Sequence, residues 1–227
     1  MFLTFLGHAC FLLQTGSTNL IIDPFLDNNP LAAAKASEVK AEWILVTHGH
    51  SDHLGDAVPI ARANNGTIIA NSEVARYCSN QGVKTHGMYI GGKHNFGDFT
   101  VKLTLALHGS STGSDPIIYL GQPCGFLIFL EGKTIYYAGD TGLFGDMEMI
   151  GRLHSPDLAI LPIGDNYTMG PEEALEAVRL IKPKMVIPMH YNTWNLIAQD
   201  PLIFRTTVES ETDTPVTVLE PGDTFKL

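Results

Sequence analysis

The stretch Thr47-His48-Gly49-His50-Ser51-Asp52-His53 decides how this sequence is interpreted. It brings three imidazoles and one carboxylate together directly after the apolar run Trp43-Ile44-Leu45-Val46. Side chains alternate faces along a strand, so an extended backbone would point the first two histidines the same way. The chain is then expected to turn, which brings the carboxylate and the third histidine to the same space from another direction.

Ligand-type side chains packed so closely are costly to bury unless something binds them, at roughly several kcal/mol in all. Borderline divalent metal ions favour imidazole nitrogen and carboxylate oxygen. We therefore interpret His48, His50, Asp52 and His53 as metal ligands. The alternative, a solvated histidine-rich loop, is disfavoured by the remaining sequence.

Later in the chain, three more ligand-type residues each follow a short apolar run. They are His108, Asp140 and His190, after residues 101–107, 134–139 and 185–189. In layered α/β structures, the carboxyl ends of the strands are where sites are usually assembled. A single strand-end histidine is more often structural, but three such residues beside a local cluster favour a metal centre.

This set of motifs resembles the metallo-β-lactamase superfamily: His48-x-His50-x-Asp52-His53, followed in order by His108, Asp140 and His190. Within it, the sequence is most similar to small bacterial and archaeal metal-dependent hydrolases, and the resemblance extends to lactonases acting on sugar-acid phosphates. Supporting stretches lie at residues 7–11, 137–142 and 188–192. The resemblance implies an α/β fold, a four-layered αββα sandwich of the metallo-β-lactamase type, with a two-metal site at one edge.

The resemblance also implies a role for each ligand. One metal would be held by His48, His50 and His108, the other by Asp52, His53 and His190, with Asp140 bridging the two. In similar hydrolases, the histidine that corresponds to His8 lies close to the metal centre. We expect His8 to contact the substrate or a ligand there, with a purely structural hydrogen bond as the alternative.

Three further polar residues lie at or beside strand ends. Asp23, in Ile22-Asp23-Pro24, is expected to stabilise the loop that bears the histidine cluster. Asp165 follows the run 161–164 at another strand end, where it is a candidate for orienting a ligand histidine. Asn192, two residues after His190, is a candidate for lining the substrate pocket, although such a residue is more often simple packing.

The ligand set predicts an enzyme. Two divalent ions roughly 3.5–4 Å apart can lower the pKa of a shared water from about 15.7 to about 7 and polarise a substrate oxygen. We predict a dinuclear metal-dependent hydrolase whose metal-bridging hydroxide attacks a small ester, lactone or phosphoester, with Asp52 holding it and receiving its proton. No protein nucleophile is expected, and Ser110-Ser111-Thr112 is interpreted as a loop.

Two other functions and several metals remain alternatives. A phosphodiesterase or nuclease acting on RNA or DNA would use the same metals, and a non-catalytic metal-binding module would use them without turnover. Zinc is the first choice for a histidine-rich site. Manganese, iron, cobalt or nickel could also occupy the mixed nitrogen and oxygen donors.

Composition is typical of a soluble enzyme. The 227 residues, with 44% hydrophobic and 17% charged, predict a single domain over residues 1–227. A net charge of −10 disfavours general binding to nucleic acid, so a small-molecule substrate is expected. No apolar run approaches the roughly 20 residues of a membrane span. The three cysteines have no CxxC spacing, which suits reduced thiols in the cytoplasm. A homo-oligomer is also expected.

The pattern of apolar residues and turn residues predicts the elements in outline. Helices are expected at 55–64, 72–80 and 171–181, the first residue of the last being Pro171. Ser72 is expected to cap the second. Strands are expected at 1–6, 9–14, 18–23, 43–47, 67–70, 83–85, 87–90, 99–107, 117–120, 124–130, 134–138, 158–161, 185–188, 216–219 and 224–227.

Overall fold

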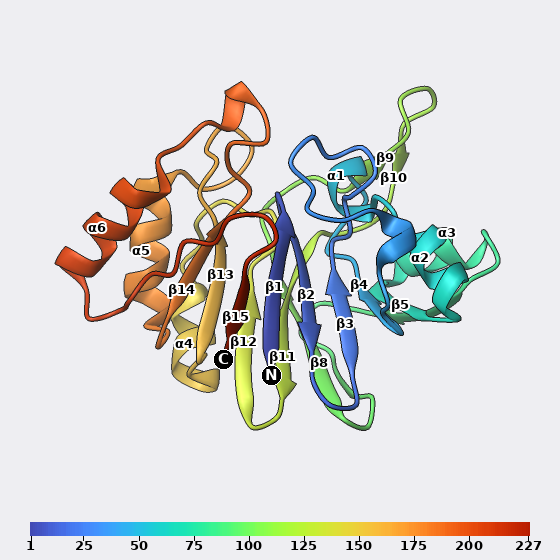
Figure 1. Cartoon of the computed structure of the whole chain (residues 1–227), viewed down its shortest axis with the longest axis horizontal. Coiled ribbons are helices and arrows are strands. Elements are labelled where there is room, and N and C mark those ends of the chain that lie inside the picture. The colour runs from blue at the N-terminus through green and yellow to red at the C-terminus, as the bar shows by residue number, and fades with distance from the viewer. The chain divides into compact units, whose positions relative to one another are not determined.

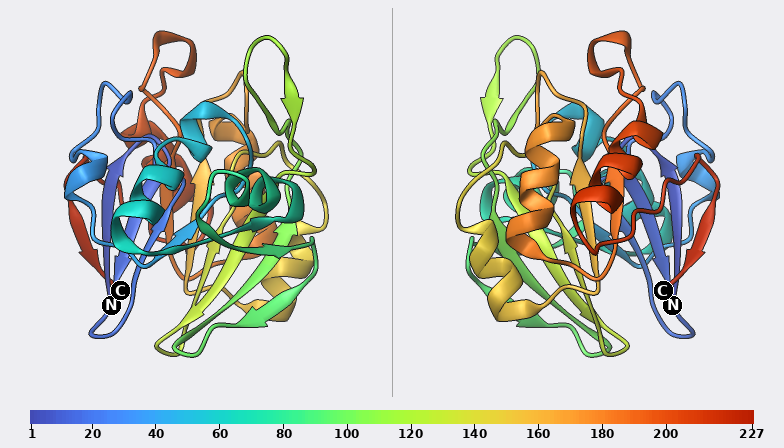
Figure 2. Two further views of the ribbon diagram at one scale, coloured as in Figure 1. Left: turned by 90° about the vertical axis from the view of Figure 1, so that its right-hand side faces the viewer. Right: turned by 90° about the vertical axis from the view of Figure 1, so that its left-hand side faces the viewer.

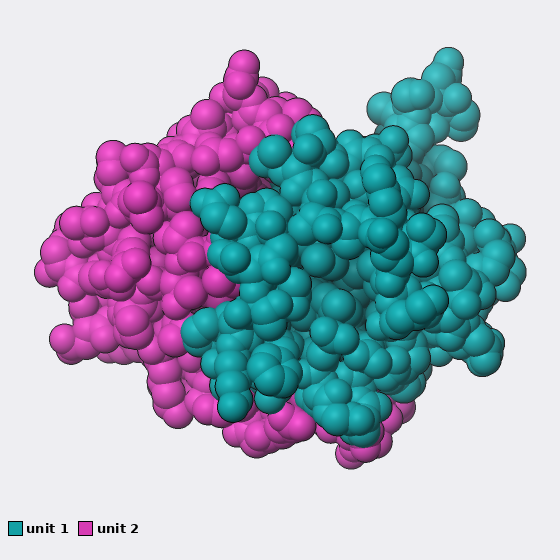
Figure 3. Space-filling model, viewed as in Figure 1, with its two compact units in different colours: residues 1–92, 109–124, 220–227 teal, residues 93–108, 125–219 magenta.

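The structure is a computed structural model that describes residues 1–227 (Figure 1). The chain divides into two compact units (Figure 3). Unit 1 contains residues 1–92, 109–124 and 220–227, and unit 2 contains residues 93–108 and 125–219. That the whole chain acts as a single domain stays a prediction.

Unit 1 is built on a seven-stranded sheet with the order β15-β1-β2-β3-β4-β5-β6. In chain order its strands are β1 (Phe2–Gly7), β2 (Cys10–Gln14), β3 (Asn19–Ile22), β4 (Trp43–Leu45), β5 (Thr67–Asn71), β6 (Lys84–Met88) and β15 (Thr224–Lys226). The strands β1, β2 and β3 form an antiparallel meander, whereas β3 to β6 run parallel. The carboxyl ends of these parallel strands lie at one edge of the sheet, and β4 leads there into the histidine-rich stretch.

Four short helical segments belong to unit 1. They are η1 (Ala36–Glu38), α1 (Ser51–Leu54), α2 (Ala57–Asn64) and α3 (Ser72–Ser79). Apolar residues of α2 and α3 pack with Ile44 and Ile68 of the sheet in one buried cluster. Asn71, and not the predicted Ser72, caps α3, because its Oδ1 accepts the N–H of Val74 at 2.7 Å.

A small hairpin is the most prominent projection of unit 1. Its strands are β9 (Ser111–Thr112) and β10 (Ile118–Tyr119), and its tip stands clear of the rest of the unit (Figures 1 and 3). At the opposite end of the unit the two termini lie side by side (Figure 2). There, Leu227 N–H donates to the carbonyl of Met1 at 3.2 Å.

Unit 2 carries a six-stranded sheet with the order β14-β13-β12-β11-β8-β7. Its strands are β7 (Lys93–Asn95), β8 (Phe99–Leu105), β11 (Cys124–Leu130), β12 (Lys133–Tyr137), β13 (Leu158–Pro162) and β14 (Val186–Met189). β12, β13 and β14 run parallel, so their carboxyl ends also share one edge. β11 occupies the predicted residues 124–130.

The helices of unit 2 are α4 (Met147–His154), α5 (Pro171–Ile181), η2 (Asn195–Ile197) and α6 (Pro201–Glu211). Pro171 begins α5 as predicted, and Glu172 and Glu173 place negative charge in its first turn. Apolar residues of α4, α5 and α6 form a buried cluster with Tyr136 and Leu161 of the sheet.

Some predicted elements differ from the structure. The strands expected at 83–85 and 87–90 are one strand, β6, because Gly87 continues the extended backbone beside β5. Residues 216–219 form only an isolated bridge, from Val216 to Val186. The helices α4 and α6 were not predicted. No helix combines the length and apolar character that crossing a bilayer requires.

Candidate metal centre

The histidine-rich stretch of unit 1 is a loop and not the end of a strand. β4 ends at Leu45, and the residues up to His50 cross an irregular turn into α1. The prediction that strand alternation orients His48 and His50 is therefore wrong. Both rings nevertheless meet across the irregular segment, with centroids 4.6 Å apart.

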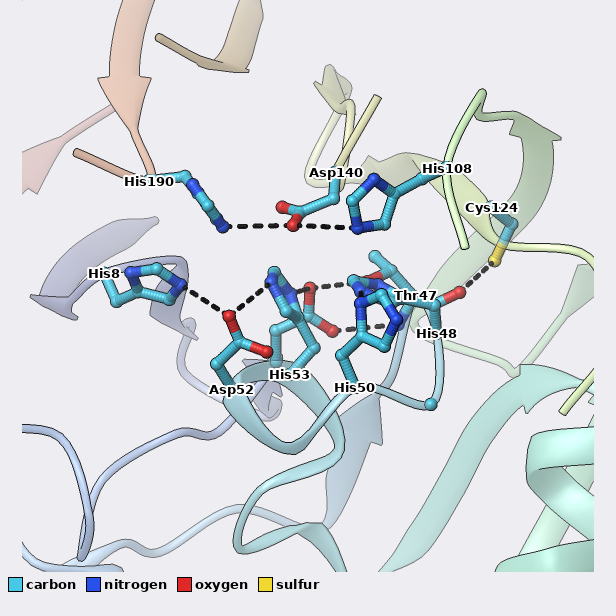
Figure 4. A network of polar contacts seen from close by, with 12 residues as sticks. His8, Thr47, His48, His50, Asp52, His53, His108, Cys124, Asp140 and His190 are labelled. Atoms are coloured by element: carbon cyan, nitrogen blue, oxygen red, sulfur yellow. Dashed lines mark hydrogen bonds and ion pairs between the residues drawn. The ribbon is translucent and has the colours of Figure 1, made fainter. Parts of the chain in front are cut away.

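His48 and His50 present two nitrogens to the same small space (Figure 4). His48 Nε2 lies 3.0 Å from His50 Nδ1. Two nitrogens bound to one tetrahedral zinc ion at ~2.0–2.1 Å would lie roughly 3.3 Å apart. On the other side of the His48 ring, Nδ1 lies 2.9 Å from the Thr47 hydroxyl. This contact leaves Nε2 as the nitrogen that faces the cluster.

Asp52 and His53 come from the short helix α1, and His8 approaches them from the end of β1. His8 Nε2 lies 3.3 Å from Asp52 Oδ2, and His53 Nε2 lies 3.9 Å from the same oxygen (Figure 4). The ligand atoms of these three residues all lie within 4.8 Å of one another. The expected proximity of His8 to the cluster is thus present within unit 1.

His8 adopts a backbone conformation that L residues rarely take. Its φ is +59°, and the preceding Gly7 has a φ of +108°. A Cβ at Gly7 would lie 2.9 Å from the carbonyl oxygen of Leu31, so the turn requires glycine there. Left-handed backbone at a non-glycine residue costs about 1–3 kcal/mol and clusters at functional sites.

Asp23 has a more direct part in the cluster than the sequence indicated. It is fully buried. Its Oδ1 accepts the Thr47 N–H at 2.8 Å, which confirms its predicted contact with the ligand loop. Its Oδ2 accepts the Thr47 hydroxyl at 2.7 Å and lies 2.8 Å from His53 Nδ1. A carboxylate only accepts, so it holds the proton on Nδ1 and turns the lone pair of His53 Nε2 toward Asp52.

Unit 2 gathers the three remaining predicted ligands around one carboxylate oxygen. Asp140 Oδ2 lies 3.0 Å from His190 Nε2 and 3.5 Å from His108 Nε2 (Figure 4). Asp140 and His190 are buried, whereas His108 is partly exposed. Asp140 follows β12, and His190 follows β14 directly. An oxygen set between two imidazole nitrogens is suited to binding metal ions.

The backbone beside His190 is tightly constrained. His190 has a φ of +57°. Gly164 lies in the loop that follows the neighbouring strand β13. It is so close to His190 that a Cβ on Gly164 would overlap the carbonyl oxygen of His190. The position of this ligand therefore depends on a glycine in an adjacent loop.

Asp165 and Asn192 are exposed and serve their own loops. Asp165 Oδ1 accepts the N–H of Asn166 at 2.7 Å. Asn192 Oδ1 accepts the N–H of Gln199 at 2.8 Å and closes the loop that follows His190. The predicted orienting role of Asp165 and substrate role of Asn192 stay predictions.

The segment Gly109-Ser110-Ser111-Thr112-Gly113 matches the pattern Gly-x-Ser-x-Gly, which marks a serine nucleophile when it forms a strand-to-helix turn. Here Ser111 lies in β9 of a hairpin. Ser110 is buried and hydrogen-bonds the backbone. The geometry of a serine nucleophile is therefore not present at this segment.

The buried cysteines near the cluster are neutral. Burial, aided by the carboxylates of Asp23 and Asp56, raises the pKa of the Cys10 thiol. Burial also raises the pKa of Cys124, whose Sγ donates to the carbonyl of Thr47 at 3.3 Å. Metal ions bind the thiolate form. The donors available to a metal in this region are therefore imidazoles and carboxylates.

Residues 2–190 match the family model described as the beta-lactamase superfamily domain. The chain therefore belongs to the β-lactamase superfamily. It is 60% identical over 229 residues to a protein of Desulforamulus reducens named UPF0173 metal-dependent hydrolase, and the match covers 100% of both chains.

Two solved structures show the same fold. The metallo hydrolase Igni18 of Ignicoccus hospitalis superposes with a TM-score of 0.91 at 37% identity, covering 100% of this chain and 98% of that one. The metallo-β-lactamase fold protein YhfI of Bacillus subtilis superposes with a TM-score of 0.74 at 15% identity, covering 99% and 98%. The predicted family and the metallo-β-lactamase fold class are confirmed.

Proposed function

We propose that this protein, a metal-dependent hydrolase of the β-lactamase superfamily, is a dinuclear enzyme that hydrolyses a small ester, lactone or phosphoester. The observation that carries the proposal is the donor chemistry of the two units. In each unit, imidazole nitrogens lie between 3.0 and 3.9 Å from a carboxylate oxygen or from one another. Such donors suit borderline divalent metals, with zinc as our first choice.

The proposed ligand assignment uses both sets. One ion would be held by His48, His50 and His108, and the second by Asp52, His53 and His190. Asp140 would be shared between them. Family membership supports this pairing, and so does the observation that Asp140 presents one oxygen to two histidines.

When bound, divalent ions supply Lewis acidity that lowers the pKa of water and polarises the substrate's carbonyl or phosphoryl oxygen. The protein's own part is to hold the ligands and manage the proton. Asp52 is the proposed proton acceptor, at Oδ2. Its side chain is 22% exposed, so a water molecule can reach it. His8 Nε2, 3.3 Å from that oxygen, fixes the orientation of the carboxylate.

The test is a substrate panel on protein stripped with a chelator and reloaded separately with zinc, manganese, iron, cobalt or nickel. We expect hydrolysis of p-nitrophenyl acetate, of a simple lactone or of bis(p-nitrophenyl) phosphate only after reloading. Asp52→Asn should lose turnover by about 10²-fold or more, since a positioned proton acceptor typically contributes that much.

Asp56→Asn is the matched control. The Asp56 carboxylate accepts the backbone N–H groups of Leu26 and Asp27, outside the donor set. Hydrolysis that survives chelation, or an unchanged rate in Asp52→Asn, contradicts the proposal. Stoichiometric metal without turnover of any substrate identifies a binding module, and salt-dependent cleavage of RNA or DNA identifies a nuclease.

We also propose a cytoplasmic enzyme that acts on a small molecule and associates with copies of itself. All three cysteines are buried and outside disulfides, which suits a reducing compartment. Cell fractionation and size-exclusion chromatography with light scattering test these proposals. Recovery in the membrane fraction, or a strictly monomeric mass, would contradict them.

A further inference from the structure

The segments at the carboxyl ends of β3, β4, β8, β12, β13 and β14 contain no lysine or arginine. They comprise residues 23–34, 46–56, 106–124, 138–146, 163–170 and 190–200, which we call the ligand-edge segments. None of the 14 lysines and arginines of the chain falls within them. Proteins recognise phosphate with arginine or lysine because these side chains supply charge-assisted hydrogen bonds. These segments supply no such group for a phosphorylated substrate.

The same segments instead expose large apolar side chains. In unit 1 they lie along β10 of the hairpin and at the residue before it, where Ile117, Ile118 and Tyr119 are 70%, 41% and 67% exposed. Consecutive apolar residues on a projecting hairpin bury little surface and do not stabilise the fold. Clustered exposed apolar residues commonly mark a surface that binds something.

The hairpin is joined firmly to the metal-ligand loop. Ser110 Oγ accepts the N–H of Gly49 at 3.1 Å and donates to the carbonyl of Leu120 at 3.2 Å. Leu120 packs so closely on Gly49 that a Cβ there would lie 2.9 Å from Leu120 Cδ1. Gly49 separates His48 from His50, so the base of the hairpin and the two histidines form one rigid assembly.

Unit 2 repeats the pattern beside its own ligand. Leu196 and Trp194, in the loop after His190, are 60% and 40% exposed, and Tyr167, in the loop after β13, is 52% exposed. The Gln199 side-chain amide reaches the carbonyl of Gly164 at 3.5 Å and ties these two loops together. In each unit, the ligand-edge segments therefore combine candidate metal ligands with exposed apolar side chains and contain no lysine or arginine.

We propose that the substrate is a neutral carboxylic ester or lactone that carries an apolar acyl or aryl group, and that these side chains contact that group. The inference rests on the proposed hydrolase function and narrows its substrate class. It excludes phosphorylated esters and phosphodiesters as the preferred substrates.

The test is an acyl-chain series on metal-reloaded protein: p-nitrophenyl acetate, butyrate and hexanoate, beside bis(p-nitrophenyl) phosphate. Each methylene moved from water to an apolar surface is worth about fourfold. We expect kcat/KM to rise about 15-fold from acetate to butyrate, which adds two methylenes, and to exceed kcat/KM for the phosphodiester. Tyr119→Ser and Leu196→Ser should each reduce the rise in kcat/KM from acetate to hexanoate.

Leu153→Ser is the matched control for Leu196→Ser. Leu153 is 63% exposed, lies on α4, and is outside the ligand-edge segments. The Leu153→Ser variant should show the same dependence of kcat/KM on acyl-chain length as the wild type. The inference is overturned if the kcat/KM of the wild type does not rise with acyl-chain length, or if the wild type prefers the phosphodiester. Either result leaves the proposed hydrolase function standing.

A binding measurement keeps the two proposals separate. Alkyl hydroxamates bind divalent metals, so calorimetry with acetohydroxamate and hexanohydroxamate reports the apolar contact without turnover. If no ester is hydrolysed, the hydrolase proposal fails. If acetohydroxamate and hexanohydroxamate bind with equal affinity, this inference fails as well. If Tyr119→Ser and Leu196→Ser dissociate an oligomer but do not change how kcat/KM depends on acyl-chain length, these residues contact another subunit and the inference is wrong.

Discussion

Replacing Asp23 with asparagine is a sharp test of how the ligand loop is held. The carboxylate accepts from Thr47 N–H at 2.8 Å and from the Thr47 hydroxyl at 2.7 Å, and it lies 2.8 Å from His53 Nδ1. The asparagine side chain has nearly the same shape but only one accepting oxygen. In either orientation of the amide, its NH₂ group meets a donor.

The expected losses can be estimated from these contacts. A hydrogen bond to a charged, buried group is worth about 1.5–3 kcal/mol, so Asp23→Asn should lower the free energy of unfolding by roughly 2–3 kcal/mol. An NH₂ group facing His53 Nδ1 also favours the tautomer that carries the proton on Nε2. A protonated Nε2 has no lone pair to offer and therefore cannot bind a metal. Loss of such an orienting partner typically costs 10–100-fold in metal affinity.

The assay has two readouts. Competition with a chromogenic chelator gives the metal affinity, and chemical denaturation of the metal-free protein gives stability. The Asp56 carboxylate accepts the backbone amides of Leu26 and Asp27. Asp56→Asn should therefore change the stability of the protein but not its metal affinity. The reasoning is refuted if Asp23→Asn binds metal as tightly as the wild type, or if Asp56→Asn weakens binding equally.

Three other variants test the fold around the site by denaturation. Burial raises the pKa of Asp157, but the ion pair with Lys184 outweighs it and leaves that pKa below its usual value. Asp157→Asn should therefore cost about 0.5–1 kcal/mol at pH 7, and the difference should vanish as the pH falls below about 4; a pH-independent difference would count against this ion pair. Asn71→Ala removes the cap of α3 and the hydrogen bonds from Nδ2 to two backbone carbonyls, so about 2–3 kcal/mol should be lost, and a loss under 0.5 kcal/mol would contradict the structure. Gly151→Ala adds a Cβ against the carbonyl of Ile181 where α4 packs on α5, and a loss of about 1–3 kcal/mol is expected despite the higher helix propensity of alanine; unchanged or greater stability would show that the two helices pack less closely.

Elements with a strong local signal could be predicted from the sequence. Residues 124–130 form a strand because an unbroken apolar run suits a strand buried on both faces. The helix at 171–181 begins at a proline with two acidic residues behind it. A comparable signal at α6 was missed: Asp200 accepts the N–H groups of Leu202 and Ile203, and Pro201 is the first helical residue.

The orientation of the ligand histidines could not be predicted from local pattern. The apolar run suggested a strand continuing through Thr47, yet the N–H of Thr47 is taken by Asp23, 24 residues earlier in the chain. This side-chain contact occupies a backbone donor just beyond the end of β4, and His48 and His50 lie in the irregular segment that follows. Contacts between residues so far apart in sequence depend on the tertiary fold.

The candidate ligand residues were easier to predict than the side chains that orient them, because the former follow from local sequence and the latter from the tertiary fold. His48, Asp140 and His190 stand at or just after strand ends in the sequence, which is a local property. The role of Asp23 in fixing the tautomer of His53 depends on a side-chain contact across 30 residues. Nothing in the Ile22-Asp23-Pro24 motif distinguishes it from an ordinary turn.

The central proposal is that the chain holds two metal ions, and metal stoichiometry tests it most directly. Elemental analysis of gently purified or reloaded protein should give two divalent ions per chain in the wild type. His50→Ala in unit 1 and Asp140→Ala in unit 2 should each abolish stoichiometric metal together with turnover, while circular dichroism shows an intact fold. Undiminished metal content or turnover in either variant would contradict the account.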